Sequence, residues 1–420
     1  MVVGSRHEGF VNFPGVARGW ILAVGLWSAL GVGLRAAEAG LATVNPDRVI
    51  VVDPVGDLGS RLDDLGRISL ETGPSWLDEL WLLGRYHGQY HWSDGSLGED
   101  QGYETRRARF GFQARLLERM TVHAQMISGR DFEPFYNGFT ELWIGWKFDP
   151  RLTLTIGQQK HRFTHDRNVS SRYINYLERA QLTNMFRADY TPAINLSGQW
   201  GRTTYHAGVF SNATGRDIVA AFSEFNSGRS LIGGVYYELE DFPGVDSAHI
   251  NVTGYDSTAN RNATNLNVFG SGLSSALILT RGAGSLITEV TGGFDAEQGD
   301  AGGFNLQPAL FLTDRLQVAL RYQMAVSDRE QGLLPQNRYE APAGLPPGEL
   351  YQAGYAGLNY YLARHRLKLM SGIEYASMDG EDVWTASTMF RFYFGPHSGS
   401  VFPTNNLLHK REGRDFLEHD

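Results

Sequence analysis

The sequence predicts an all-β protein, a transmembrane antiparallel β-barrel of about sixteen strands. Three observations predict this fold class. From residue 82 onward, segments of alternating residues recur, many near the roughly 9 to 11 residues that a tilted strand needs to cross a bilayer. The links between these segments alternate between short and long. The chain also begins with an export signal and has no comparable apolar stretch after residue 40.

The first 39 residues have the pattern of a signal peptide. Arg6 and Arg18 supply positive charge, residues 19–34 are apolar, and Ala37 to Ala39 have the small-x-small form of a cleavage site. A transmembrane anchor normally needs about 20 apolar residues, and this run is shorter and interrupted by glycine. We therefore expect export, followed by an acidic periplasmic extension over residues 40–79.

The barrel is expected over residues 80–394, with residues 395–420 as a periplasmic tail. The predicted strands are 82–92, 103–117, 120–128, 139–148, 152–161, 193–201, 203–212, 230–239, 246–256, 264–280, 284–294, 303–313, 316–326, 350–362, 367–378 and 383–394.

The links support a barrel that spans the outer membrane. Links after even-numbered strands are usually tight, such as Glu118-Arg119 and Asp314-Arg315. Links after odd-numbered strands are mostly long, and the longest are 130–138, 162–192, 213–229 and 327–349. Short turns on one side and long loops on the other are typical of outer-membrane barrels. An even number of strands places both termini in the periplasm.

Side-chain alternation predicts one face for lipid and one for water. In segment 383–394, Trp384 and Phe390 fall on one face, and Thr385 and Arg391 fall on the other. A soluble barrel would place its apolar face inside, and alternation does not separate the two cases. Sixteen strands make a cylinder too wide for side chains to fill, so we expect a wet lumen.

Composition excludes several classes of function. The chain has no cysteine and a net charge of −9, which excludes thiol chemistry and makes nucleic acid a poor partner. His161 and His165 are four residues apart but have no third metal ligand nearby, and Glu141 and Glu374 match no acid-base arrangement. We expect no cofactor, no metal and no enzyme activity.

The insert after the fifth strand is the most unusual segment. Ordinary hairpin loops have about 2 to 5 residues, whereas this link runs from Arg162 to Pro192. Residues 158–192 carry six basic and three acidic residues. Either the insert folds into the lumen, where rings of Arg or Lys select anions, or it stays outside and its charges are solvated. We predict that it folds inward as the third extracellular loop.

A column of arginines is predicted on one strand wall. Alternation places Arg107, Arg109 and Arg115 on the inward face of segment 103–117, where planar guanidinium groups offer successive sites for an oxyanion. The alternative is a structural wall of arginines paired with loop carboxylates. With the insert and the inward face of segment 316–326, the candidate anion-binding residues are Arg107, Arg109, Arg115, Lys160, Arg162, Arg167, Arg172, Arg179, Arg187 and Arg321.

At these residues the sequence resembles the phosphate-selective porin O and P family. The matching stretches are RRARFG at 106–111, LTIGQQK at 154–160 and SSRYINYLERA at 170–180. The resemblance implies a trimeric sixteen-stranded channel whose third loop enters the pore, with basic residues that conduct phosphate or related anions. These roles carry over to Arg107, Arg109 and Lys160, and then to Arg172 and Arg179. The sequence departs from the family in having Lys160 as the only lysine of the insert, and in continuing past the aromatic Phe394.

Together these features predict an outer-membrane porin for small anions, with phosphate as the leading candidate. A general or differently selective porin is the alternative within channels. A barrel enzyme, an adhesive scaffold with an occluded lumen, and a secreted soluble β protein are the alternatives from other classes.

Overall fold

The computed structural model describes residues 61–68, 74–297 and 299–396. The predicted signal peptide, most of the predicted extension 40–79 and most of the tail 395–420 lie outside the described residues. No helix in the described part of the chain is long and apolar enough to cross a membrane.

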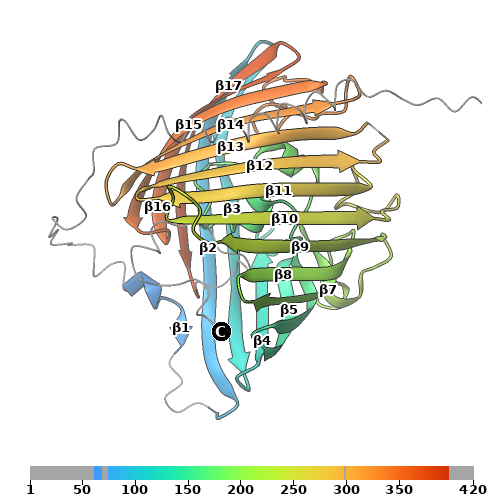
Figure 1. Ribbon diagram of the computed structural model, residues 1–420, viewed down its shortest axis with the longest axis vertical. Coiled ribbons are helices and arrows are strands. Elements are labelled where there is room, and N and C mark those ends of the chain that lie inside the picture. Colours follow the sequence, from blue (N-terminus) through green and yellow to red (C-terminus); the bar gives the residue numbers. More distant parts are fainter. Residues whose placement is uncertain (1–60, 69–73, 298, 397–420) are drawn as a thin grey trace, which may run out of the picture.

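Sixteen strands, β2 to β17, form a closed antiparallel barrel (Figure 1). Each strand pairs with the next in sequence, and β17 pairs with β2 from Val383–Gly95 to Phe394–Gly84, which closes the sheet. The predicted fold class is therefore confirmed. The strands are β2 (Leu77–Gly95), β3 (Gly98–Leu116), β4 (Met120–Ile127), β5 (Phe139–Asp149), β6 (Leu152–Lys160), β7 (Tyr190–Trp200), β8 (Thr203–Ser211), β9 (Arg229–Leu239), β10 (Ser247–Ser257), β11 (Ser271–Arg281), β12 (Gly284–Phe294), β13 (Ala301–Phe311), β14 (Leu316–Ser327), β15 (Leu350–Ala363), β16 (Leu367–Met378) and β17 (Glu381–Phe394).

The observed strands differ from the predicted ones mainly at two places. The first hairpin, β2 and β3, is longer than predicted and continues in register to the pair Gly95 and Gly98. The strand predicted at 264–280 begins only at Ser271. Polar residues in both regions satisfy strand and loop patterns equally, so alternation alone did not place these ends.

The two faces of the barrel have opposite character. On β14 the side chains of Gln317, Arg321 and Gln323 are buried, whereas Leu320 and Tyr322 are exposed. On β17, Arg391 is buried and Trp384 is exposed. Polar residues that are buried and apolar residues that are exposed are the reverse of a soluble core, and they fit a lipid-facing exterior.

A short strand before the barrel, β1 (Arg67–Ile68), pairs with the start of β2 at Trp81 and Leu80. β17 ends opposite Gly84, so β1 occupies the edge of β2 that β17 leaves unpaired. Four short helices lie in the loops: η2 (Arg130–Phe132), α3 (His165–Asn168), α4 (Gln181–Met185) and α5 (Ala220–Ser223).

Asp63 joins the segment before β1 to the barrel. Its carboxylate pairs with Arg364 at 2.8 Å and with the buried Arg366 at 3.0 Å, and Arg366 also donates to the Gly395 carbonyl at 2.7 Å. We expect Asp63→Ala to destabilise the barrel by about 2 kcal/mol, because hydrogen bonds between charged groups are lost. The measurement is the temperature at which the folded band disappears in detergent electrophoresis. Asp64→Ala is the control, since the Asp64 side chain is largely exposed, and equal effects of the two variants would contradict this assignment.

Candidate functional site

In the structure the insert predicted at 162–192 consists of residues 161–189, which connect β6 to β7 and are mostly buried. The name insert is used for residues 161–189 from here on. Their polar contacts reach β10, β12, β14, β15, β16 and β17, as well as β2 and β3. Strands β14 to β17 lie across the ring from β6 and β7 in the strand order. A segment that touches both sides of a closed barrel passes through its interior.

Arg391 of β17 binds the tip of the insert, residues 171–177. Its guanidinium donates to four carbonyls of the insert, at 2.9 to 3.2 Å; these belong to Ser171, Ile174, Tyr176 and Leu177. The Lys368 ammonium of β16 donates to the Ile174 carbonyl at 3.2 Å. These cations therefore satisfy backbone acceptors of a segment that has no regular secondary structure.

The tip reaches the short-turn end of the barrel. The ring of Tyr173 packs edge-on against His365 and Tyr393, with centroids 5.3 and 6.2 Å apart. The guanidinium of Arg172 donates to the Pro396 carbonyl at 3.0 Å. His365 lies in the turn between β15 and β16, so the insert extends through most of the barrel height.

Glu289 of β12 holds the first helix of the insert. Its buried carboxylate accepts the backbone N–H of His165 at 2.5 Å and of Asp166 at 3.1 Å. It also accepts the hydroxyl of Ser274 at 2.7 Å. The first turn of α3 has N–H groups without helical partners, and Glu289 satisfies two of them.

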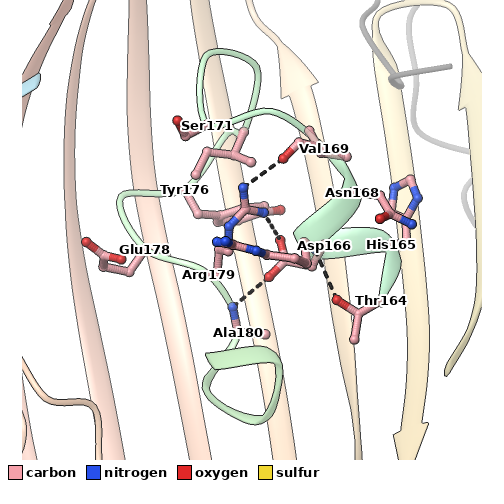
Figure 2. A network of polar contacts seen from close by, with 12 residues as sticks. Thr164, His165, Asp166, Asn168, Val169, Ser171, Tyr176, Glu178, Arg179 and Ala180 are labelled. Atoms are coloured by element: carbon pink, nitrogen blue, oxygen red, sulfur yellow. Dashed lines mark hydrogen bonds and ion pairs between the residues drawn. The ribbon is translucent and has the colours of Figure 1, made fainter. Parts of the chain in front are cut away.

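The insert is also braced internally (Figure 2). The carboxylate of Asp166 accepts the Ala180 N–H at 2.9 Å and lies 3.8 Å from the guanidinium of Arg179. Arg179 donates in turn to the Val169 carbonyl at 2.7 Å. Burial lowers the pKa of Arg179 to about 10, so it remains charged at neutral pH. These contacts join Asp166 and Val169, in the descending half of the insert, to Arg179 and Ala180, in its returning half.

Cations form two rows on the inner wall where the barrel closes. The pairing register sets Arg391 opposite His87 and His87 opposite Arg107. The next row sets Arg85 opposite Arg109. Directly opposite residues lie about 5 Å apart, so four guanidinium groups gather on three strands.

These wall arginines are mostly bound to neutral groups. Arg85 donates to the Ser171 hydroxyl, and Arg109 donates to the Tyr190 hydroxyl, both at 2.9 Å. One terminal nitrogen of Arg107 and both ring nitrogens of His87 are buried without a hydrogen-bond partner among the described residues. No carboxylate lies within 4 Å of Arg85, Arg107, Arg109 or Arg391 in the described part of the chain. Their positive charge is therefore not neutralised by direct ion pairs.

A β-bulge places Arg106 inward beside this group. The pairing of β2 with β3 skips Arg106, since His87 pairs with Arg107 and Gly88 pairs with Thr105. Arg106 then binds the carboxylate of Glu178 with two hydrogen bonds, at 2.5 and 2.9 Å. Burial opposes ionisation of Glu178, but the Arg106 guanidinium prevails and holds the pKa of Glu178 well below its ordinary value. Bulges commonly redirect a side chain in this way.

The predicted site residues fall into groups. Arg107 and Arg109 are buried on the inner wall, and Arg109 donates to Tyr190 of β7, whereas Arg115 lies near the short-turn end, 3.9 Å from Glu79. Arg321 donates to the Glu178 carbonyl at 2.8 Å and pairs with Glu374 at 2.7 Å. Lys160, at the end of β6, donates to the carbonyls of Asn168 and Val169. The basic residues of the insert have these contacts: Arg167 with Asp189, Arg172 with Ser170 and Pro396, Arg179 with Asp166 and Val169. Arg162 is half-buried and Arg187 is exposed.

Sequence reasoning missed Arg85, Arg106, Lys368 and Arg391 as site residues. Alternation placed Arg391 on the polar face of its strand. It was not selected because the search looked for several basic residues on one strand, and this face has only one. Their grouping depends on the register of β17, β2 and β3 and on one bulge. A search for basic residues at inward positions of neighbouring strands would have found Arg85 and Arg391.

Comparison with known proteins agrees with this architecture. The model of the family described as phosphate-selective porin O and P matches residues 83–227. No curated protein matches the chain. The matched segment contains the wall arginines of β2 and β3 and the whole insert.

Solved structures share the fold at low identity. OprB of Pseudomonas putida is 13% identical, with a TM-score of 0.55 over 75% of this chain and 94% of that one. An anion-selective porin from Comamonas acidovorans is 12% identical, with a TM-score of 0.54 over 75% and 99%. A trimer form of OmpT from Vibrio cholerae is 10% identical, with a TM-score of 0.50 over 74% and 99%. The chain has the sixteen-stranded barrel fold of outer-membrane porins, and its resemblance to the phosphate-selective porin O and P family is confirmed over residues 83–227.

Proposed function

We propose that this barrel is an outer-membrane porin that passes small anions by diffusion, with phosphate as the leading candidate, and that the insert forms its constriction. The observation that carries the proposal is the group of four wall guanidiniums, three of which, on Arg85, Arg109 and Arg391, are bound to hydroxyls and carbonyls. Such partners fix the positions of the cations and leave their charge in place. A fixed positive field between low-dielectric walls concentrates anions and excludes cations.

The comparisons support the same proposal. The matching family is described as phosphate-selective, and one structural relative is described as anion-selective. Neither the family description nor the fold suggests a reaction, so we propose a channel and not an enzyme. We also propose export by the signal peptide at residues 1–39 and a homotrimer, since one structural relative is described as a trimer form.

Single-channel recording with two anions tests the substrate class. The full-length protein is placed in a planar bilayer in potassium chloride, and phosphate is added at constant ionic strength. We expect phosphate to reduce the chloride current in a saturable manner, because a divalent oxyanion binds the guanidinium group more tightly than chloride. A chloride current that does not respond to phosphate would favour a general porin.

Substitution of the predicted column is the second test. Replacing both Arg107 and Arg109 with alanine should lower the anion preference and leave heat-resistant folding intact, because lumen substitutions tune selectivity more than stability. The control is Arg281→Ala, an exposed arginine at the end of β11. Unchanged selectivity in the double variant would show that the column is structural.

A further inference from the structure

A second loop also packs inside the barrel. Residues 328–349, here called the strap, connect β14 to β15, and Leu333, Tyr339, Ala343 and Leu345 are buried. Two backbone hydrogen bonds between Leu333 and Gly348, of 2.8 and 3.0 Å, close the base of the strap. The strap is therefore a compact segment with buried side chains of its own.

The strap reaches β2, β3 and the insert. Arg338 forms an ion pair with Glu104 of β3, and Tyr339 accepts a hydrogen bond from Gln89 and packs on His91, with ring centroids 4.9 Å apart. Two contacts then join the strap to the insert. The Tyr339 hydroxyl donates to the carboxylate of Glu178 at 3.4 Å, and the Gln181 amide donates to the Leu334 carbonyl at 2.5 Å. The strap thus lies against the returning half of the insert.

Glu340 lies at the centre of the strap with 2% of its surface exposed. One carboxylate oxygen accepts the Tyr351 hydroxyl and the other accepts the Gln336 N–H, both at 2.7 Å. No cation lies within 4 Å of Glu340 in the described residues. The charged groups that face it are Glu374 of β16 and Arg321 of β14, which pair with each other at 2.7 Å. Glu340 is therefore a buried carboxyl group without a counterion of its own.

We propose that the strap positions the insert and that the protonation of Glu340 controls how firmly it does so. This inference rests on the proposed role of the insert as the constriction. The strap is the segment that contacts the Glu178 carboxylate opposite Arg106, so its release removes one support of that buried ion pair. A buried carboxylate without a counterion is unfavourable, whereas the protonated acid is readily buried.

The direction of the pH effect follows from the two states of Glu340. Burial, with a smaller contribution from Glu374, raises the pKa of Glu340 to about 7 in the packed strap. In a released, hydrated strap the carboxyl has its ordinary pKa of about 4.3. The packed strap is therefore fully favoured below that ordinary value, and the preference is lost as pH rises through about 7. We expect the ratio of packed to released strap to fall on the order of 100-fold across this range.

Thiol labelling measures release directly, because the natural chain has no cysteine. Ala343→Cys places a thiol where the side chain is fully buried, and Asn262→Cys supplies an exposed reference in another loop. The full-length protein in detergent is treated with a water-soluble maleimide at pH about 5.5 and about 8.5. The rate at position 343 divided by the rate at position 262 corrects for the pH dependence of the thiol reaction itself. A folded band in electrophoresis confirms each variant, and Leu345→Cys is the second position.

We expect this rate ratio to rise at least about tenfold at the higher pH. In the Glu340→Gln background it should stay at its low value, because the amide has no charge to bury. The matched control, Glu349→Gln, changes an exposed carboxylate of the same loop and should behave like the parent. A ratio that does not change with pH, or that changes equally in the Glu340→Gln background, would overturn the proposal.

Conductance of the same variants separates this inference from the proposed function. The parent channel should show more frequent current fluctuations as pH rises through about 7, and Glu340→Gln should remove that dependence. If labelling depends on Glu340 but the channel has no anion preference, the proposal for the strap stands and the anion function is rejected. If the channel prefers anions but labelling does not depend on pH, the anion function stands and the proposal for the strap is rejected.

Discussion

Replacing Glu178 with glutamine is expected to release the returning half of the insert and to raise the single-channel conductance. The Glu178 carboxylate accepts two hydrogen bonds from Arg106 and contacts Tyr339 of the strap. Removing one partner of a buried ion pair costs about 3 kcal/mol or more, because the other charge stays buried and unpaired. Arg106 would then add a free guanidinium to the lumen. We expect roughly a twofold higher conductance and a stronger anion preference.

The control for this variant is Glu99→Gln, which removes the same charge from an exposed position at the start of β3. Glu99→Gln should leave both quantities close to those of the parent. A Glu178→Gln channel with the parental conductance would show that the ion pair does not hold the insert.

Replacing Arg391 with methionine is expected to free the tip of the insert. Four carbonyls of residues 171–177 accept hydrogen bonds from this one guanidinium, and a charge-assisted hydrogen bond contributes about 1.5 to 3 kcal/mol. Methionine keeps the length of the side chain and removes every donor. We expect a higher conductance and a weaker anion preference, because the channel is wider and has lost one wall cation.

Arg391→Lys distinguishes geometry from charge in the same experiment. Lysine keeps the positive charge but lacks the planar fork that reaches several carbonyls at once. It should restore most of the anion preference and little of the parental conductance. Full recovery of the conductance by lysine would contradict the assigned role of the four hydrogen bonds. Arg281→Met is the control for loss of an exposed arginine.

Most of the barrel could be predicted from the sequence because its strands follow a period of two. All sixteen barrel strands were placed, and the faces of β14 and β17 were assigned correctly. β1 was missed because two residues are too few to show any period. The inward packing of the strap was also missed, since its prolines and glycines indicate a loop and say nothing about where the loop lies.

The candidate site could be predicted only in part. Basic residues cluster in the insert and on β3, and this pattern is visible in the linear sequence. The group formed by Arg391, Arg85 and Arg107 depends on which residues face each other across strands, and register is not encoded locally. Most acceptors of these arginines are carbonyls or hydroxyls, whereas sequence reasoning considered carboxylates as the structural alternative. Among the arginines on the barrel wall that the structure describes, only the bulged Arg106 has an insert carboxylate as its partner.

The reversal potential of the full-length protein in a gradient of potassium chloride tests the central claim most directly. Fixed guanidinium charge beside the insert should make chloride more permeant than potassium. The reversal potential should therefore have the sign of the chloride equilibrium potential. Raising the salt concentration should reduce this preference, because counterions screen exposed charges over about 10 Å at 0.1 M salt and over less at higher concentration. A reversal potential with the sign of the potassium equilibrium potential at low salt would contradict the account.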